Sequence, residues 1–487
     1  MLFNSIDFAI FLPVVFLLYW FALGGKRRPQ NYLLLLASYV FYGWWDWRFL
    51  GLMAFSTVVD YLIGQRLGNT LQPKQRKLLL GVSLTANLGL LGFFKYYNFF
   101  VESFTEAFTF FGVGFSLNSL SIVLPVGISF YTFQTLSYTL DVYHKRLKPT
   151  KDFVDFAAFV SFFPQLVAGP IERATHLIPQ FARDRTFSYP LAVNGMRQIL
   201  WGLVKKMLIA DNCSQFANQI FDNYADQSSY MLILGAFFFS LQIYGDFSGY
   251  SDIAIGVSKL FGFNLMQNFA FPYFSRDMAE FWRRWHISLS TWFRDYLYIP
   301  LGGSKGGRYM QLRNTFIIFA VSGFWHGANW TFLCWGLLNA LYFLPLLFAG
   351  KNRIHLGVVA EGKLFPSLRE LWGMTSTFIL TMFAWILFRA ESMSQAGSYI
   401  YNLITGIHHV QYLSTTKDFL VNEVGLVVLM LIVGFTMIEW LGREGQFAID
   451  SLPDKVPRPV RWSIYVAAIL LLASYGGTQQ EFIYFQF

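Results

Sequence analysis

Long apolar runs separated by short polar connections extend from one end of the chain to the other. The runs lie near residues 5–23, 31–48, 49–65, 77–95, 120–141, 153–169, 193–210, 230–263, 312–323 with 327–349, 371–389, 422–441 and 460–475. A bilayer core is crossed by roughly 20 mostly apolar helical residues, and these runs are too long for the strands of a membrane barrel. The pattern therefore predicts an all-α, polytopic transmembrane protein with about 11–12 spans.

Composition strengthens this prediction. Of the 487 residues, 55% are hydrophobic and only 13% are charged, whereas soluble chains are roughly 25% charged. The net charge of +9 would be compatible with nucleic-acid binding, but the basic residues lie in short loops between apolar runs, so we read them as topology signals and expect no nucleic acid. The two cysteines, Cys213 and Cys334, are too few for a disulfide framework or a thiolate metal cluster.

Positive charge in alternate loops predicts the orientation of the chain. The basic residues of these loops are Lys26, Arg27 and Arg28, then Arg66, Lys74, Arg76 and Lys77, then Lys145, Arg146, Lys148 and Lys151. Loops rich in Lys and Arg stay in the cytoplasm, which places the amino terminus outside a cytoplasmic (inner) membrane. The first apolar run has no basic residue before it, so we interpret it as a retained span and not as a cleaved signal.

The regular alternation ends after residue 150. Apolar sequence is interrupted there by Pro164, Gly169, Pro170, Pro179 and Pro190. Irregular backbone at membrane depth is tolerated only where protein buries it or where it lines a wet cavity, so we predict broken or re-entrant helices around a central cavity. The sequence has no internal repeat and no detached polar segment, and we treat residues 1–487 as a single integral membrane domain.

Residues 277–296 carry charges that an ordinary span would lack. On one continuous helix, an aromatic and apolar face would lie beside a polar stripe; the face contains Phe281, Trp285, Leu289, Trp292 and Tyr296, and the stripe contains Arg283, His286, Ser290 and Arg294. One interpretation is a helix that simply lies in the membrane interface. The other is a functional stripe in which His286 and its cationic neighbours attract phosphate or carboxylate.

His326 lies inside an apolar stretch that continues on both sides. A charged imidazolium is costly at that depth, so we expect a neutral ring that is able to accept a proton. On a helix, Ser322 and Asn329 would lie near the same face and could fix its tautomer, although Gly323 and Gly327 make irregular backbone equally compatible. The structural alternative is a buried histidine that only bonds to a neighbouring helix.

Asp246 and Asp252 lie within one apolar run, next to Gly245 and Gly249. This composition predicts a break in the helix. On a straight helix the two carboxylates are about 240° apart, so they would not form a paired acid–base dyad. Each carboxylate either caps a helix end or pairs with a nearby Arg, or else Asp246 orients a catalytic histidine.

Several common catalytic motifs are missing from the sequence. It contains no GxxxxGK[ST] phosphate loop, no HExxH zinc helix and no GxSxG nucleophile elbow. These absences remove the sequence basis for an ATPase, a metalloprotease or a serine hydrolase. We predict no metal site.

Five segments together resemble one family over essentially the whole chain. They are PVGISFYTF at 125–133, FFPQLVAGPI at 162–171, the segment around Asp246, RRWHISLSTWFRDYLYIPLGG at 283–303 and FIYFQF at 482–487. With His286 and His326, they resemble the membrane-bound O-acyltransferase (MBOAT) family. The resemblance is to its bacterial polysaccharide branch, which includes alginate and peptidoglycan O-acetylation and, more distantly, D-alanyl transfer to teichoic acid.

The resemblance implies a ring of tilted helices around a thin central region, with a funnel from the cytoplasm. The resemblance implies that His326 is the essential histidine and that His286 is its partner. The implied donor is acetyl-CoA or an acylated carrier protein, with no bound cofactor. The implied acceptor is a hydroxyl group for extracytoplasmic polysaccharide acetylation, finished by an extracytoplasmic acetyltransferase partner.

Roles for the side chains follow from what acyl transfer requires. His326 would take the proton of the acceptor, and His286 or Asn329 would donate to the oxyanion or hold the acceptor. Arg283, Arg284 and Arg294 would meet donor phosphates at the mouth of the funnel. The rival hypothesis is a transporter or flippase of an acylated or glycan substrate, because broken helices and intramembrane Asp or His also mark substrate pathways.

Overall fold

The computed structural model describes residues 1–112 and 119–485, and within them the chain forms helices and no strands. This confirms the all-α class. The chain divides into two compact units, of which unit 1 comprises Met1–Ala192 with Val257–Met266, and unit 2 comprises Val193–Gly256 with Gln267–Phe487. The single domain expected from the sequence is not tested by this division and stays a prediction.

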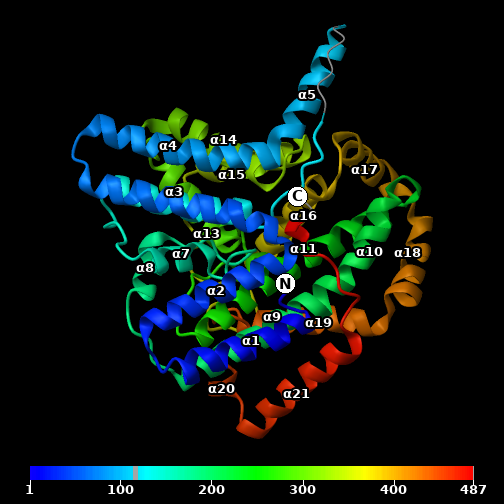
Figure 1. The fold of residues 1–487 in the computed structure, drawn as a ribbon. Helices are drawn as coiled ribbons and strands as arrows, with labels where there is room; N and C mark the ends of the chain where they lie inside the picture. The colour runs from blue at the N-terminus through cyan, green and yellow to red at the C-terminus, as the bar shows by residue number, and fades with distance from the viewer. Residues whose placement is uncertain (113–118, 486–487) are drawn as a thin grey trace. The chain divides into compact units, whose positions relative to one another are not determined.

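Unit 1 contains the first eight α-helices (Figure 1). They are α1 (Ile6–Leu17), α2 (Arg27–Asp46), α3 (Leu50–Asn69), α4 (Pro73–Leu91), α5 (Tyr97–Phe110), α6 (Ile128–Tyr143), α7 (Phe153–Ser161) and α8 (Ala174–Phe181). Buried polar side chains connect these helices: Asp60 on α3 accepts a hydrogen bond from Asn87 on α4 at 2.8 Å and from Thr139 on α6 at 3.1 Å. Such bonds satisfy groups that could not be left unpaired in an apolar interior.

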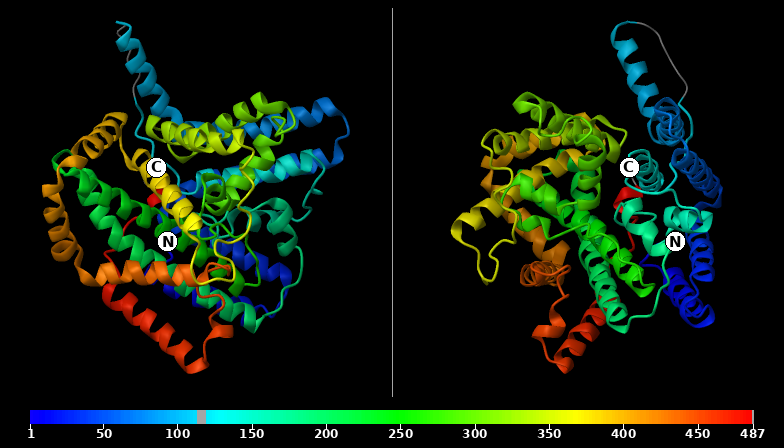
Figure 2. Two further views of the ribbon diagram at one scale, coloured as in Figure 1. Left: turned by 180° about the vertical axis from the view of Figure 1, so that it is seen from behind. Right: turned by 90° about the vertical axis from the view of Figure 1, so that its left-hand side faces the viewer.

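Unit 2 contains the later helices, of which α14 and α15 run side by side (Figures 1 and 2). Two helices, α9 (Tyr189–Leu203) and α11 (Ser229–Leu260), have residues in both units. The others are α10 (Asp211–Asp222), α12 (Met278–Arg284), α13 (Ile287–Phe293), α14 (Gly307–His326), α15 (Trp330–Phe348), α16 (Leu368–Arg389), α17 (Met393–Thr405), α18 (Leu413–Phe419), α19 (Gly425–Gly442), α20 (Leu452–Lys455) and α21 (Arg458–Tyr475).

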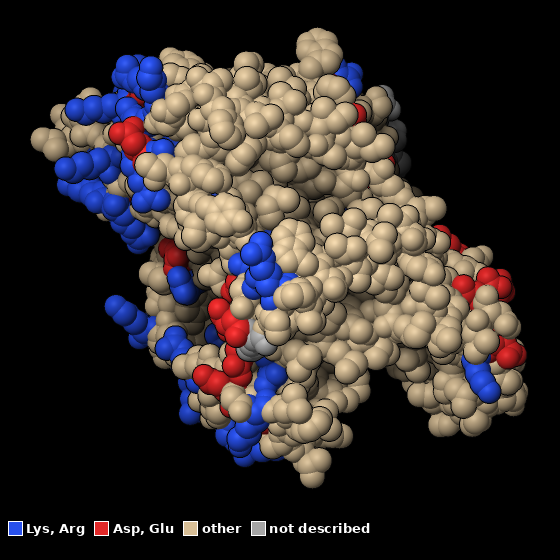
Figure 3. Space-filling view, turned by 90° about the horizontal axis from the view of Figure 1, so that it is seen from below, with Lys and Arg blue, Asp and Glu red and all other residues tan. Residues whose placement is uncertain are grey.

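Five helical stretches of the described residues are long and apolar enough to cross a membrane. They are Pro73–Phe110, Ser229–Leu260, Trp330–Phe348, Leu368–Arg389 and Val410–Gly442. Figure 3 shows Lys and Arg side chains gathered in a few patches, with wide areas of the visible face carrying no charge. Length, composition and surface agree with a multi-pass membrane protein.

Two predicted spans are shorter in the structure than in the sequence analysis. In the run at 120–141 the helix begins only at Ile128, because Gly127 takes a left-handed backbone conformation with φ 76°. In the run at 153–169 the helix ends at Ser161, and a buried irregular segment follows. Pro164 and Pro170 lack the N–H groups that would continue a helix, so the predicted interruption of helices lies here.

The predicted break at Asp246 is wrong, because α11 is continuous from Ser229 to Leu260. Its glycines serve close packing instead. A Cβ on Gly249 would lie 2.8 Å from the carbonyl oxygen of Gly202, and one on Gly245 would lie 2.9 Å from that of Lys205. Small residues at such positions let two helical backbones approach each other.

Candidate active site

His326 is the last residue of α14, in the helical hairpin formed by α14 and α15. The two helices cross at Gly323 and Gly336, whose Cα atoms approach so closely that a Cβ on Gly323 would lie 3.3 Å from the Cα of Gly336. A Cβ on Gly323 would also collide with the carbonyl oxygen of Phe332. The glycines therefore set the position of the helix end that carries His326.

The imidazole of His326 is buried among aromatic rings. Its ring centroid lies 4.9 Å from that of Trp325, 5.1 Å from that of Trp335 and 5.3 Å from that of Phe388. Tyr484, from the carboxyl-terminal segment, lies 5.6 Å away by the same measure. The side chain is only 3% exposed, so water is largely excluded from it.

The segment 277–296 is not one continuous helix, which corrects the prediction. Helix α12 ends at Arg284 and α13 begins at Ile287, with His286 between them in a left-handed conformation of φ 44°. Trp285 is 1% exposed, so the predicted aromatic face packs inside the protein. The segment therefore does not float in the membrane interface.

Asn268 holds the histidine at this break. The Nδ1 of His286 lies 3.1 Å from the Asn268 Oδ1, and the backbone N–H of Ile287 donates to the Asn268 carbonyl oxygen at 2.9 Å. His286 Nε2 is buried and has no hydrogen-bond partner among the described residues. Because the ring is buried, the pKa of His286 falls from its ordinary value to about 3, which keeps the imidazole neutral.

One cavity of about 720 Å³ is lined by both histidines. It lies between α12, α13, α14, α15 and the loop that follows α15. The ring centroids of His286 and His326 are 6.4 Å apart. The structure therefore brings together, at the edge of one cavity, two imidazoles that lie 40 positions apart in the sequence.

The three arginines proposed to bind donor phosphates differ in their positions. Arg283 and Arg294 line the cavity. Arg283 also donates to the carbonyl oxygens of Asn352 and His355, both at 2.8 Å, and thereby holds the loop at the cavity edge. Arg284 does not line the cavity, and its guanidinium bonds to Glu280 at 2.9 Å.

Ser322 and Asn329, both expected beside His326, lie in different places in the structure. Ser322 lines the same cavity as the histidines. Asn329 caps α15 by accepting from the backbone N–H of Thr331 at 3.0 Å, and its amide donates to the carbonyl oxygen of Glu391 at 2.8 Å. Its oxygen and its amide nitrogen are both occupied by the backbone, so it holds a helix start and does not line the cavity.

Asp246 bonds to a cation and to the backbone. Its Oδ1 lies 2.9 Å from Lys206 Nζ, and its Oδ2 accepts from the N–H of Ile483 at 2.7 Å. Asp252 pairs with Lys205 at 2.5 Å. Both carboxylates are thus paired with a cation, but the cation is a lysine and not the predicted arginine. Asp246 fixes the segment that carries Tyr484, and its partners in these bonds, Lys206 and Ile483, do not include either histidine.

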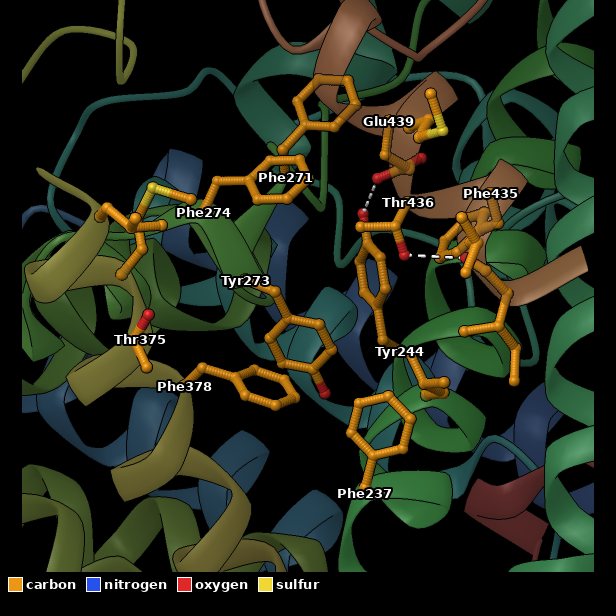
Figure 4. Close-up of a pocket in the computed structure, with 16 residues that line it drawn as sticks. Phe237, Tyr244, Phe271, Tyr273, Phe274, Thr375, Phe378, Phe435, Thr436 and Glu439 are labelled. Carbon is orange, nitrogen blue, oxygen red and sulfur yellow. Dashed lines mark hydrogen bonds between the residues drawn. The ribbon is translucent and has the colours of Figure 1, made fainter. Parts of the chain in front are cut away.

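A second cavity, of about 490 Å³, is apolar and lies between α11, α16 and α19 (Figure 4). The carboxylate of Glu439 lies at its edge, where it accepts from Tyr244 Oη at 2.5 Å and from Trp201 Nε1 at 3.0 Å. Both carboxylate oxygens are thus used in bonds within the protein. This cavity offers apolar volume and little reactive chemistry.

Sequence reasoning missed three residues near the histidines. Asn268 carried no local signal, because a single amide in an apolar segment is unremarkable until its contacts are known. Arg353 lines the cavity from the loop that follows α15. Tyr484 belongs to the terminal FIYFQF segment, which carried the resemblance but no role. The described residues contain no group of three or more His, Cys, Asp or Glu placed to hold a metal ion.

Comparison with known proteins gives the family. The family model for MBOAT, the membrane-bound O-acyltransferase family, matches residues 148–353, which include His286 and His326. A probable alginate O-acetylase of Pseudomonas aeruginosa is 41% identical over 475 residues, covering 96% of this chain and 86% of that protein. The chain belongs to the MBOAT family. As a member, it is a multi-pass membrane O-acyltransferase, and the transporter hypothesis gives way to an enzyme.

Other similar MBOAT relatives act on different polymers. A peptidoglycan O-acetyltransferase of Helicobacter pylori is 32% identical, with 100% of this chain and 98% of that protein covered. A teichoic acid D-alanyltransferase of Bacillus subtilis is 27% identical over 230 residues, which covers 45% of this chain. The resemblance to acetyl-transferring relatives thus extends over the whole chain, and the resemblance to the D-alanyl-transferring relative extends over less than half.

Proposed function

We propose that this MBOAT enzyme transfers an acetyl group from a cytoplasmic thioester to an acceptor hydroxyl, for O-acetylation of an extracytoplasmic polysaccharide such as alginate. The observation that carries the proposal is the single cavity lined by His286 and His326. The full-length similarity to an alginate and a peptidoglycan acetylating relative supports the acetyl group and the polymer class.

The two imidazoles can supply the chemistry that acyl transfer needs. In the reaction a C–O bond forms between the acceptor and the acetyl carbonyl, the C–S bond breaks, and the hydroxyl proton finally resides on the thiol. One group must take that proton, and another must meet the carbonyl oxygen as it becomes negative. From the sequence we assigned removal of the hydroxyl proton to His326. Because both rings line the cavity, one histidine can take the proton while the other contacts the acceptor or the carbonyl oxygen.

The positive side chains at the cavity support a thioester donor that carries phosphates. Arg283 and Arg294 line it together with Arg353. Acetyl-CoA and an acylated carrier protein both present a pantetheine arm attached to phosphate, and guanidinium groups bind phosphate strongly. We propose that these three residues meet the donor and that Arg284, which pairs with Glu280, does not.

The membrane setting completes the proposal. We place the enzyme in the cytoplasmic membrane with its amino terminus outside, since the basic loops are expected on the cytoplasmic side. An extracytoplasmic acetyltransferase would take the acetyl group onward to the polysaccharide. Exclusion of water from the buried histidines would limit hydrolysis of the thioester.

Replacement of His326 tests the function. In host cells carrying His326→Ala at wild-type abundance, we expect the alkali-labile acetate of the extracellular polysaccharide to fall by about 100-fold or more, because a group for proton transfer is lost. The exposed His144 is the matched control, and His144→Ala is expected to keep full acetylation. Undiminished acetate with a folded His326→Ala protein would refute the proposed role.

The nature of the acyl group needs a second measurement. The purified enzyme in lipid vesicles is supplied with radiolabelled acetyl-CoA or with an acetylated carrier protein, and the release of free thiol is followed. We expect thiol release that depends on an added hydroxyl acceptor. Transfer of D-alanine but not of acetate would replace the acetyl proposal with D-alanyl transfer, and movement of a substrate without thiol release would contradict both.

A further inference from the structure

Asn268 makes an unusual set of bonds to three consecutive residues. Its backbone carbonyl oxygen accepts from the N–H of Ile287 at 2.9 Å. Its side-chain Oδ1 lies 3.1 Å from His286 Nδ1 and accepts from the backbone N–H of Ser288 at 3.3 Å and from the Ser288 hydroxyl at 2.9 Å. One residue thus holds both the backbone after His286 and the ring itself.

The backbone that Asn268 holds is strained. His286 has φ 44° and ψ 54°, a left-handed conformation that side chains with a Cβ seldom adopt. Such a conformation costs free energy and persists only when surrounding bonds enforce it. The bonds from Ile287 and Ser288 to Asn268 supply that enforcement. They hold His286 at a position where it lines the cavity.

The orientation of the Asn268 amide follows from its partners. A backbone N–H can only donate, so the atom that bonds to the N–H of Ser288 must be the carbonyl oxygen. The amide nitrogen points to the Ser251 hydroxyl on α11, at 3.0 Å. An amide oxygen accepts only, so the His286 nitrogen beside it must carry a hydrogen. In a neutral imidazole the other nitrogen, Nε2, then holds a lone pair.

We propose that Asn268 is a positioning residue that holds His286 as the Nδ1–H tautomer, so that Nε2 accepts the hydrogen bond of the acceptor hydroxyl. The proposal rests on the proposed acyl transfer and deepens it. A neutral ring in this tautomer has no proton to offer a carbonyl oxygen through Nε2. Of the two roles predicted for His286, donation to the oxyanion is therefore excluded and holding a hydroxyl of the acceptor remains, while the transferred proton stays assigned to His326.

The first part of the test measures the tautomer and needs no activity. Full-length protein with nitrogen-15 in its histidines is examined by NMR, and the signals of His286 are identified by their loss in His286→Ala. We expect a protonated Nδ1 and an unprotonated Nε2 in the wild-type protein, and a loss of this fixed state in Asn268→Ala. A protonated Nε2 in the wild-type protein would overturn the proposal.

The second part separates positioning from general stability. We expect Asn268→Ala to lower kcat by about 10- to 100-fold, the range seen when an orienting partner is lost, with little change in KM for the acetyl donor. Asn268→Asp keeps an accepting oxygen and should restore both the tautomer and most of kcat. The control is the buried Asn339, whose amide donates to the carbonyl oxygen of Trp335 at 2.9 Å and which does not line the cavity. Asn339→Ala should keep the tautomer of His286 and kcat near wild type.

The outcomes distinguish a failure of the positioning role of Asn268 from a failure of the proposed acyl transfer. An Asn268→Ala protein that keeps the Nδ1–H tautomer and wild-type kcat refutes the positioning role. An Asn268→Asp protein that is folded but no more active than Asn268→Ala also refutes it, because the accepting oxygen would then be irrelevant. If the wild-type tautomer is as expected but no thioester is consumed, the positioning of His286 stands and the proposed acyl transfer fails.

Discussion

Asp246 and His286 lie in two buried polar clusters of unit 2 that differ in what their side chains have left to bind. Around Asp246, Lys206 Nζ reaches two carboxylates, that of Asp246 at 2.9 Å and that of Asp211 at 2.8 Å, and also donates to the carbonyl oxygen of Gln480. Around His286, Asn268 binds one ring nitrogen and leaves the other with no partner among the described residues.

The difference distinguishes a buried cluster that stabilises the fold from one that is left able to bind a substrate. A buried charge is tolerated when an opposite charge and hydrogen bonds compensate it, and the cluster at Lys206 meets this condition. A buried nitrogen that keeps its lone pair without a hydrogen-bond partner is a cost to folding. Such a cost is expected where a substrate will supply the missing bond. The predictions below test this division.

The largest effect is expected for His286. His286→Ala should lower acetyl transfer by about 1,000-fold, because the group that holds the acceptor hydroxyl beside the thioester is lost. It should lower stability less than Lys206→Met does, since the ring already borders a cavity and makes one side-chain hydrogen bond. The rate of thiol release and the melting temperature of the purified protein measure both. If transfer stays within threefold of wild type, the unpaired nitrogen is not functional and the comparison fails.

The second prediction concerns Lys206. Lys206→Met should lower the free energy of unfolding by about 4 kcal/mol, because Asp246 and Asp211 would be buried without their cation. Transfer per folded molecule should fall far less than in His286→Ala. Thermal unfolding in detergent measures the change, with the exposed Lys305 as control in Lys305→Met. An unchanged melting temperature would show that this cluster does not stabilise the fold.

The third prediction concerns Glu280, whose carboxylate is already paired with two arginines next to the site. Glu280 is buried between Arg276 and Arg284, at 2.9 Å from each. Burial alone would raise the pKa of Glu280, but the bonds from Arg276 and Arg284 outweigh it and hold the pKa below its ordinary value. Glu280→Gln should cost about 3 kcal/mol, less than Lys206→Met, since Arg276 keeps Glu370 as a partner.

This prediction also has a pH dependence. A carboxyl whose pKa is lowered by folding stabilises the protein above its unfolded pKa, and this stabilisation is lost as the pH falls through the folded pKa. The stability difference between the wild-type protein and Glu280→Gln should therefore be full at pH 7 and shrink below about pH 4. Melting temperatures measured across this range provide the check. A difference that grows on acidification would contradict the sign.

The apolar pattern predicted the helices well where the decisive interactions are local. The runs without a predicted interruption became α15, α16 and α19, because a helix is the structure that satisfies its own backbone bonds in lipid. The prediction failed at Asp246, where glycine and carboxylate suggested a break. The partners that explain them, Gly202 and Lys206, lie some 40 residues earlier, and no local pattern reveals such pairing.

The candidate site was also predicted only in part. His286 and His326 stood out because ionisable groups are costly in an apolar chain. The break at His286 could not be predicted, because neither glycine nor proline marks it and the bonds that enforce it come from Asn268. Arg284 was grouped with Arg283 by sequence, although adjacent residues on a helix point about 100° apart; only Arg283 lines the cavity.

The smallest effect is expected for Arg353, which extends the comparison to the rim of the cavity. Arg353→Gln should raise KM for the acetyl donor about fivefold, because one partly solvated guanidinium contact to phosphate contributes about 1 kcal/mol. It should leave kcat unchanged, since a contact made equally in the bound substrate and the transition state affects binding alone. Arg308, an exposed residue that does not line this cavity, supplies the control, and Arg308→Gln should keep the wild-type KM. Equal KM values for the two variants would remove Arg353 from the donor site and leave Arg283 and Arg294 as the cations to test.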